Sequence, residues 1–291
     1  MIKEVSAFVN SFDKLGYVVD EELATILYLM TSLQKPLLLE GHPGVGKTEV
    51  ANILAAHLGT ELIRLQCYEG LDIHSAVYEW NYQKQLLSIK IQESNQKTDT
   101  EKEKHIFGED FLMPRPLLKA ISGKTKSPVL LIDEIDRADE EFEAFLLELL
   151  SAYQISIPEF GTISAKYPPF VILTSNRTRE LSDALRRRCL YHWVNYPDFE
   201  KELRIVHKHL PDINQKLSAQ LVRTIHILRN KNLEKSPGIS ETLDWAMSLH
   251  ALGKKELDEE SFAMTQGSVL KSYSDTEKIK SAGVANILEG G

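Results

Sequence analysis

The chain has 291 residues, of which 43% are hydrophobic, and its net charge is −8. This is enough apolar sequence for a full core and about two domains. The acidic balance argues against a general nucleic-acid-binding surface but leaves room for a local basic channel. No apolar run approaches the roughly 20 residues that span a bilayer, and Met1–Val5 begins no signal-peptide pattern. We therefore expect a cytoplasmic protein without a membrane span, with Cys67 and Cys189 as reduced core thiols.

The first predicted elements alternate between helix and strand. Apolar residues have the spacing of one helix face over residues 21–33. A buried strand is expected at 36–40, a helix at 49–58 and a second strand at 61–66. This order places a glycine-rich loop between a strand and a helix.

That loop fits the pattern G-x-x-x-x-G-K-[ST], which in this context predicts a phosphate-binding site. Glycines let backbone N–H groups converge on an anion, and the N-terminus of the following helix adds its positive dipole end. Lys47 is expected to reach the β and γ phosphates of a nucleotide, and Thr48 to hold Mg²⁺ through its hydroxyl. An ordinary glycine turn is the alternative. The predicted nucleotide-binding residues here are Gly41, His42, Pro43, Gly44, Val45, Gly46, Lys47, Thr48 and Glu49.

Residues 68–92 form an unusual segment that is rich in aromatic side chains and helix formers, and the polar run at 94–104 favours a solvated loop. A helix here would place Tyr78 and Tyr82 on one face and turn Trp80 away from it. These aromatic side chains either pack the segment onto the body of the protein or contact another protein.

A buried strand at 127–134 ends in two acids, Asp133 and Glu134. Parallel strands place their C-terminal ends beside a phosphate loop. We therefore expect Asp133 to bind the Mg²⁺ shell, and Glu134 to orient an attacking water or accept its proton. Helix N-capping is the alternative role for such a pair.

The next predicted strand, at 170–174, is followed by Asn176. A helix at 140–152 and a β-hairpin at 154–166 are expected before it. The amide of Asn176 can hydrogen-bond both a γ-phosphate and the attacking water, and an ordinary turn residue is the alternative.

Three arginines in sequence, Arg186, Arg187 and Arg188, come soon afterwards. One of them, pointing into the ATP of a neighbouring subunit, would act as an arginine finger that spreads the charge of the transition state. A solvated charge cluster is the alternative for any one of them.

From residue 198 onward the apolar periodicity is wholly helical. Strands that alternate with helices, followed by helices alone, predict an α/β fold with a parallel sheet and a small all-α lid. We expect a nucleotide-binding domain at 1–197, with an insert at about 68–108, and the lid at 198–291.

In these motifs, their order and their spacing, the chain resembles the P-loop AAA+ ATPases and, within them, the MoxR-type group. The resemblance runs from about Gly16 to Trp245. The insert looks like the helix-2 insert of that group, and the hairpin looks like its pre-sensor-one hairpin. Residues 132–139, 173–181 and 184–193 are similar to CoxD-like members, which are linked to maturation of molybdenum-containing carbon monoxide dehydrogenase.

The resemblance implies ATP and Mg²⁺ as cofactors and a ring of identical subunits, most simply a hexamer. It also implies a von Willebrand factor A domain partner and a client enzyme. An adenine pocket is implied near Tyr17 and Val18, and the guanine-reading Asn-Lys-x-Asp motif is absent at 230–233. Arg188 aligns with the Arg of the family's Asp-Arg-Phe pattern and is the favoured finger, with Arg187 second.

The chain departs from the family pattern at the start of a lid helix. MoxR-type lids carry a sensor-two Arg after a Ser-Pro pair, but residues 236–242 contain no Arg. Either Lys235 or a neighbour substitutes for it, or the lid senses nucleotide weakly.

Three functions compete on this evidence. The first is an ATP-hydrolysing chaperone that remodels or matures a client protein. The second is a nucleic-acid motor or restriction-type translocase subunit, against which the acidic balance and the lack of an appended DNA-binding motif argue. The third is a non-hydrolysing nucleotide switch, against which Glu134 and Asn176 argue.

Overall fold

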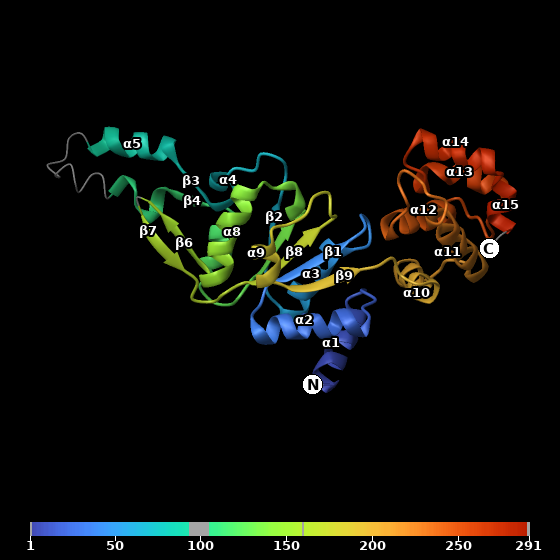
Figure 1. The fold of residues 1–291 in the computed structure, drawn as a ribbon, viewed down its shortest axis with the longest axis horizontal. Coiled ribbons are helices and arrows are strands. Elements are labelled where there is room, and N and C mark those ends of the chain that lie inside the picture. The colour runs from blue at the N-terminus through green and yellow to red at the C-terminus, as the bar shows by residue number, and fades with distance from the viewer. Residues whose placement is uncertain (1, 93–104, 159, 290–291) are drawn as a thin grey trace. The chain divides into compact units, whose positions relative to one another are not determined.

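A computed structural model describes residues 2–92, 105–158 and 160–289 (Figure 1). The chain divides into two compact units. The first comprises Met1–Ala24, Gly41–Glu49 and Trp193–Gly291, and the second comprises Thr25–Glu40 and Val50–His192. The polar run at 94–104 lies outside the described residues.

The central sheet has five strands in the order β2-β5-β8-β1-β9. The pairs β2–β5, β5–β8 and β1–β8 are parallel. Val, Ile and Leu fill the middle strands, and β5 is buried along its whole length, as expected for a parallel sheet covered on both faces. The strands are β1 (Leu37–Gly41), β2 (Leu62–Gln66), β5 (Val129–Asp133), β8 (Phe170–Ser175) and β9 (Leu190–Val194). The first four were predicted, and β9 was not.

Several helices accompany the sheet, and those at 21–33, 47–58 and 140–152 form where the sequence predicts helices. The carboxylate of Asp139 accepts a hydrogen bond of 2.8 Å from the amide of Phe142, which caps the helix α8. An additional helix, α1 (Ile2–Lys14), was not predicted. The others are α2 (Glu21–Leu33), α3 (Lys47–Leu58), α7 (Pro116–Ile121), α8 (Glu140–Ala152) and α9 (Asp183–Arg188).

The aromatic segment is not one helix, so the face predicted for its rings is wrong. It forms α4 (Ile73–Val77), β3 (Tyr78–Trp80) and α5 (Tyr82–Gln92), and β3 pairs in antiparallel fashion with β4 (Leu112–Pro114). A strand has a side-chain period of two, so Tyr78 and Trp80 share one face and are 8% and 7% exposed. Tyr82 lies beyond the strand and is 64% exposed. A 3₁₀ turn, η1 (Glu109–Phe111), precedes β4.

An antiparallel hairpin follows α8. It pairs β6 (Gln154–Ile157) with β7 (Gly161–Ser164). Gly161 has φ +102° at its bend, a conformation that side chains rarely allow.

The chain after β9 is wholly helical and has a core of its own. Leu217, Leu221, Ile225 and Leu228 are fully buried and form the apolar stripe of one of these helices, in agreement with the helical periodicity predicted after residue 198. At the centre, the indole of Trp245 donates a 2.7 Å hydrogen bond to Thr265. The helices are α10 (Phe199–His209), α11 (Gln215–Arg229), α12 (Ile239–Ala251), α13 (Glu259–Val269), α14 (Tyr273–Ala282) and α15 (Val284–Glu289) (Figure 1).

The architecture is therefore the predicted α/β class, a parallel sheet with helices followed by a helical region. Within the described part of the chain, no helix combines the length and the hydropathy that a bilayer crossing needs.

Candidate active site

The predicted phosphate loop has the backbone of an anion-binding turn. It continues directly from β1, and α3 begins inside it at Lys47. Gly44 and Gly46 have φ of +74° and +91°, which only glycine adopts readily. Loops of this kind point successive N–H groups at one place, and the N-terminus of α3 adds its dipole there.

The side chain of Lys47 is held in place at this loop. Its side chain is buried, and its ammonium nitrogen donates to the carbonyl oxygens of Gly41 and His42, both at 2.8 Å. Thr48 follows in the first turn of α3 and is half-buried. The cation is thus fixed beside the backbone that would contact phosphate.

Three aromatic side chains and one valine belong to the same unit as the loop. The ring of His42 stacks on Tyr196 with centroids 4.9 Å apart, and Trp193 meets His42 edge-on at 5.7 Å. Val18 is buried. Burial first, and then the charges of Asp20 and Glu49, raise the pKa of Tyr17. The predicted residue Tyr17 is therefore within electrostatic reach of the loop residue Glu49.

In the other unit, Thr174 links the two acids at the end of β5. Its hydroxyl donates to Asp133 Oδ1 at 2.5 Å and accepts from the amide of Glu134 at 2.9 Å. Arg64 donates to Asp133 Oδ2 at 2.6 Å. The buried Asp133 charge is therefore compensated on both oxygens, as a buried charge requires.

Glu134 has an unusual backbone. Its φ of 55° and ψ of 49° are left-handed helical, which costs a non-glycine residue about 1–2 kcal/mol. Such strain clusters at functional sites. The side chain is 32% exposed and pairs with Arg137 at 2.9 Å, and it makes no capping hydrogen bond to the 3₁₀ helix η2 (Ile135–Arg137) that follows. The structure thus gives no support to the helix-capping alternative.

Asp136 holds the loop that carries Asn176. Its buried carboxylate accepts from the amide of Asn176 at 3.2 Å, and from the amide and hydroxyl of Thr178 at 2.8 and 2.7 Å. Arg177, between them, is left-handed with φ of 57°. Sequence reasoning missed Asp136 and Thr174. The available signals were a third acid three residues after Asp133, and a hydroxyl inside an apolar strand.

Asp133, Glu134 and Asp136 place three carboxylates near the end of β5. Burial first, and then Asp133, Asp136 and Glu134, raise the pKa of the Cys67 thiol to about 12. The carboxylate of Asp133 is a hard oxygen donor of the kind that Mg²⁺ prefers, and so is the hydroxyl of Thr48 in the unit that carries the phosphate loop.

The three arginines have different surroundings. Arg186 lies 3.8 Å from Glu40, and Arg188 donates to the hydroxyl of Ser151 at 2.9 Å and to the carbonyl of Ala184 at 3.1 Å. Arg187 is exposed, and within the described ranges no hydrogen bond or ion pair holds its guanidinium.

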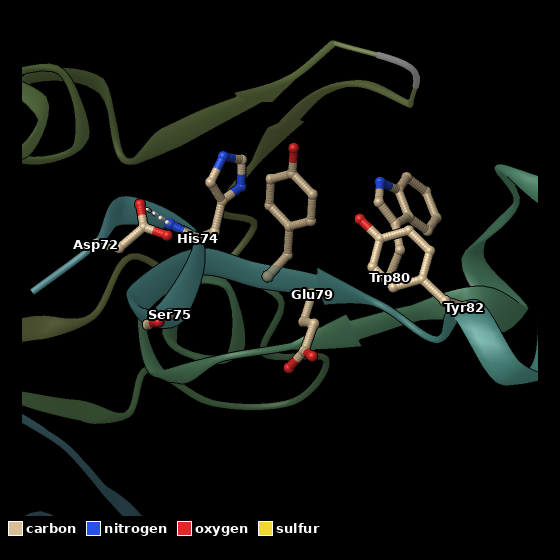
Figure 2. A pocket seen from close by; sticks show the side chains of 7 residues that line it. Asp72, His74, Ser75, Glu79, Trp80 and Tyr82 are labelled. Atoms are coloured by element: carbon tan, nitrogen blue, oxygen red, sulfur yellow. Dashed lines mark hydrogen bonds between the residues drawn. The ribbon is translucent and has the colours of Figure 1, made fainter.

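A separate cavity of about 390 Å³ lies on the insert. In Figure 2, Asp72 and His74 stand at one end and Trp80 and Tyr82 at the other, while Glu79 points away. None of its lining residues is predicted to bind nucleotide. The lining consists of Asp72, His74, Ser75, Tyr78, Glu79, Trp80 and Tyr82.

The chain is similar to several known proteins. A profile of the AAA domain (dynein-related subfamily) matches residues 36–189. An uncharacterized protein of Staphylococcus haemolyticus is 28% identical over 185 residues, which cover 62% of each chain, so the match spans less than two thirds of that relative. An uncharacterized protein of Staphylococcus aureus (strain bovine RF122 / ET3-1) is 28% identical over 226 residues, 76% of each chain. Among solved structures, a RuvB mutant of Thermotoga maritima has a TM-score of 0.50 at 17% identity, covering 85% of this chain and 68% of that one. This last likeness concerns the fold alone.

Proposed function

The chain belongs to the AAA domain family, dynein-related subfamily, and on that premise we propose that it binds ATP with Mg²⁺ and hydrolyses the ATP to ADP and phosphate. The observation that carries this proposal is the glycine loop, in which Gly44 and Gly46 have positive φ and the buried ammonium of Lys47 donates to the carbonyl oxygens of Gly41 and His42. The pair of acids joined by Thr174 supports it independently.

Each residue of the proposed site has a distinct task. Lys47 neutralises the β and γ phosphates, and Asn176 orients the attacking water. Thr48 and Asp133 would hold Mg²⁺, and the ion would supply further charge neutralisation. Glu134 accepts a proton from the attacking water, and the oxygen of that water forms a bond to the γ-phosphorus. The bond between the γ-phosphorus and the β–γ bridging oxygen breaks at the same time, and ADP is released.

We further propose that the ATPase is a MoxR-type chaperone of the CoxD-like subgroup. It would act in the cytoplasm as a ring, most simply a hexamer, with a von Willebrand factor A domain partner. Its client would be a molybdenum-containing carbon monoxide dehydrogenase. The proposed division is a nucleotide domain at 1–197 and a lid at 198–291, with Tyr17 and Val18 at the adenine. The insert with β3 and β4, and the hairpin β6–β7, support this assignment because they occupy the positions that the resemblance predicts.

Two assays test the proposal. Phosphate release from ATP by the purified protein is expected to require Mg²⁺, and its absence with every partner tried would reject ATP hydrolysis. Filter binding with single- and double-stranded DNA at low and moderate salt separates a chaperone from a nucleic-acid motor. We expect no retention of DNA at moderate salt, and tight retention with ATPase stimulation would favour the motor.

A further inference from the structure

The lid touches the phosphate loop through the main chain. The amide of Ile239, at the start of α12, donates to the carbonyl oxygen of Gly44 at 2.8 Å. A Cβ atom on Gly238 would lie 2.8 Å from both the Cα and the oxygen of Gly44, and one on Gly44 would lie 3.1 Å from the Cα of Gly238. Two glycines are therefore needed for the two backbones to approach so closely.

A buried arginine holds this lid segment in place. The guanidinium of Arg229, at the end of α11, donates to the carbonyl oxygen of Pro237 at 2.8 Å. It also forms two hydrogen bonds of 2.7 Å to the fully buried carboxylate of Glu202. That carboxylate accepts a further 2.7 Å hydrogen bond from Thr242, in the first turn of α12. The planar fork of an arginine suits such a bidentate pair, and a lysine cannot reproduce it.

The same arginine reaches the loop by a second route. Its guanidinium carbon lies 4.5 Å from the ring centroid of Tyr196, a cation–π contact. Tyr196 in turn stacks on His42 at 4.9 Å with the rings 10° from parallel. Arg229 thus connects to Gly44 through Pro237 and to His42 through Tyr196.

We propose that Arg229 is a positioning residue, which holds the start of α12 and the ring of Tyr196 against residues 42–44 and so makes lid position and ATP affinity interdependent. This inference rests on the proposed binding of ATP at the loop. It also accounts for the missing sensor-two Arg, because the lid acts on the loop through its main chain and not through a side chain after Ser236-Pro237. Lys235 is exposed, and its amide donates to Asp275.

The first test forces the main chain at residue 238 away from the main chain at Gly44. Gly238→Ala places a methyl group where the backbone of Gly44 lies, so we expect ATP to bind at least tenfold more weakly by fluorescent-nucleotide titration. Gly267→Ala is the matched control, because it adds the same methyl group to α13 with no atom within 4 Å. The control is expected to bind ATP within twofold of the wild type. Equal affinity of the Gly238→Ala protein and the wild type would overturn the proposal.

The second test asks whether Arg229 couples the lid to the loop or only stabilises the lid. The double variant Arg229→Met with Glu202→Gln removes the ion pair without leaving a buried charge alone. In the wild type, ATP is expected to slow hydrogen exchange at residues 237–243. In the double variant we expect the lid to remain folded by circular dichroism while ATP no longer slows this exchange, and Arg229→Lys to be intermediate.

The outcomes can be told apart. If the wild type binds no ATP, the proposed function fails, and that result appears without any variant. If the wild type binds ATP but the double variant shows the same ATP-dependent protection, the assignment of Arg229 fails alone. If the double variant is unfolded, the Gly238→Ala titration decides, because that change leaves the Arg229–Glu202 pair in place.

Discussion

Thr174 shows how one side chain can position a pair of acids. Its hydroxyl is both donor to Asp133 and acceptor for the amide of Glu134, so it fixes the two acids relative to each other across neighbouring strands. Position matters at this scale, since a misplacement of about 1 Å can cost about a hundredfold in rate.

Replacing Thr174 by valine keeps the shape of the side chain and removes both hydrogen bonds. We expect kcat for ATP to fall at least tenfold with a small change in KM, because Lys47 still binds the phosphates. The free energy of unfolding should fall by about 1–3 kcal/mol, which is the cost of leaving buried polar groups without hydrogen bonds. Thr162→Val, on the exposed strand β7, is the control. An unchanged kcat in the Thr174 variant would show that Thr174 does not position the two acids for hydrolysis.

The two cysteines provide a pH-dependent prediction. Burial raises the pKa of both Cys67 and Cys189 to about 12, against the usual value of about 8.5. The thiolate is the reactive form, so native protein at pH 8 should react with a thiol reagent at least about a hundredfold more slowly than unfolded protein. Both thiols bind their protons more tightly in the folded state than in the unfolded state. Their protonation therefore stabilises the fold below about pH 8.5, and this stabilisation is lost as pH rises toward 12. Rapid labelling of native protein at pH 8 would contradict the burial of these thiols.

At the scale of elements, the sequence predicts those helices, strands and loops that show apolar periodicity or a motif of known spacing. The strands β1, β2, β5 and β8 and the helices α2, α8 and α11 could be found in this way, as could the phosphate loop and the two acids at the end of β5. The strands β3 and β4 could not, because each has three residues and is stabilised by a partner more than thirty residues away. The contacts of Asp136 and Arg229 depend on tertiary packing in the same way.

A substitution at Trp80 tests whether this side chain packs the insert onto the core. Its ring meets Tyr78 at 6.0 Å and Phe107 at 5.4 Å, and it belongs to the main core. Trp80→Ala is expected to destabilise the fold by about 3 kcal/mol, and Tm should fall by roughly 6–12 °C. Tyr82→Ala removes an exposed ring from the next element and should leave Tm within about 1 °C. If instead Trp80→Ala leaves Tm unchanged and only client activation in cells is lost, the ring serves a partner and not the core.

At the scale of the whole molecule, the proposal requires more than one copy of the chain. Arg187 and Arg188 are both exposed, but only Arg188 has hydrogen-bond partners among the described residues of its own subunit. An arginine that completes the site of a neighbour must act in trans, since it would contact a nucleotide held by another subunit.

Mixing two inactive proteins tests this directly. Arg188→Ala lacks the favoured finger, and Lys47→Ala lacks nucleotide binding, so each should be inactive alone. A mixed ring contains an interface at which an intact ATP site faces an intact arginine, and partial hydrolysis should return. The same mixture with Arg187→Ala shows which arginine acts. No recovery at any ratio, with mixed rings verified, would argue for an arginine that acts in cis or for none.

The most direct measurement of the central claim compares ATP binding and ATP turnover in the Glu134→Gln protein. The amide keeps the size of the side chain but cannot accept the proton of water, so binding should stay within a few-fold of the wild type while hydrolysis falls at least about a hundredfold. Lys47→Ala is the matched control and should lose tight binding itself, because the charge that neutralises the phosphates is gone. Hydrolysis by Glu134→Gln at the wild-type rate would contradict the assignment of this site.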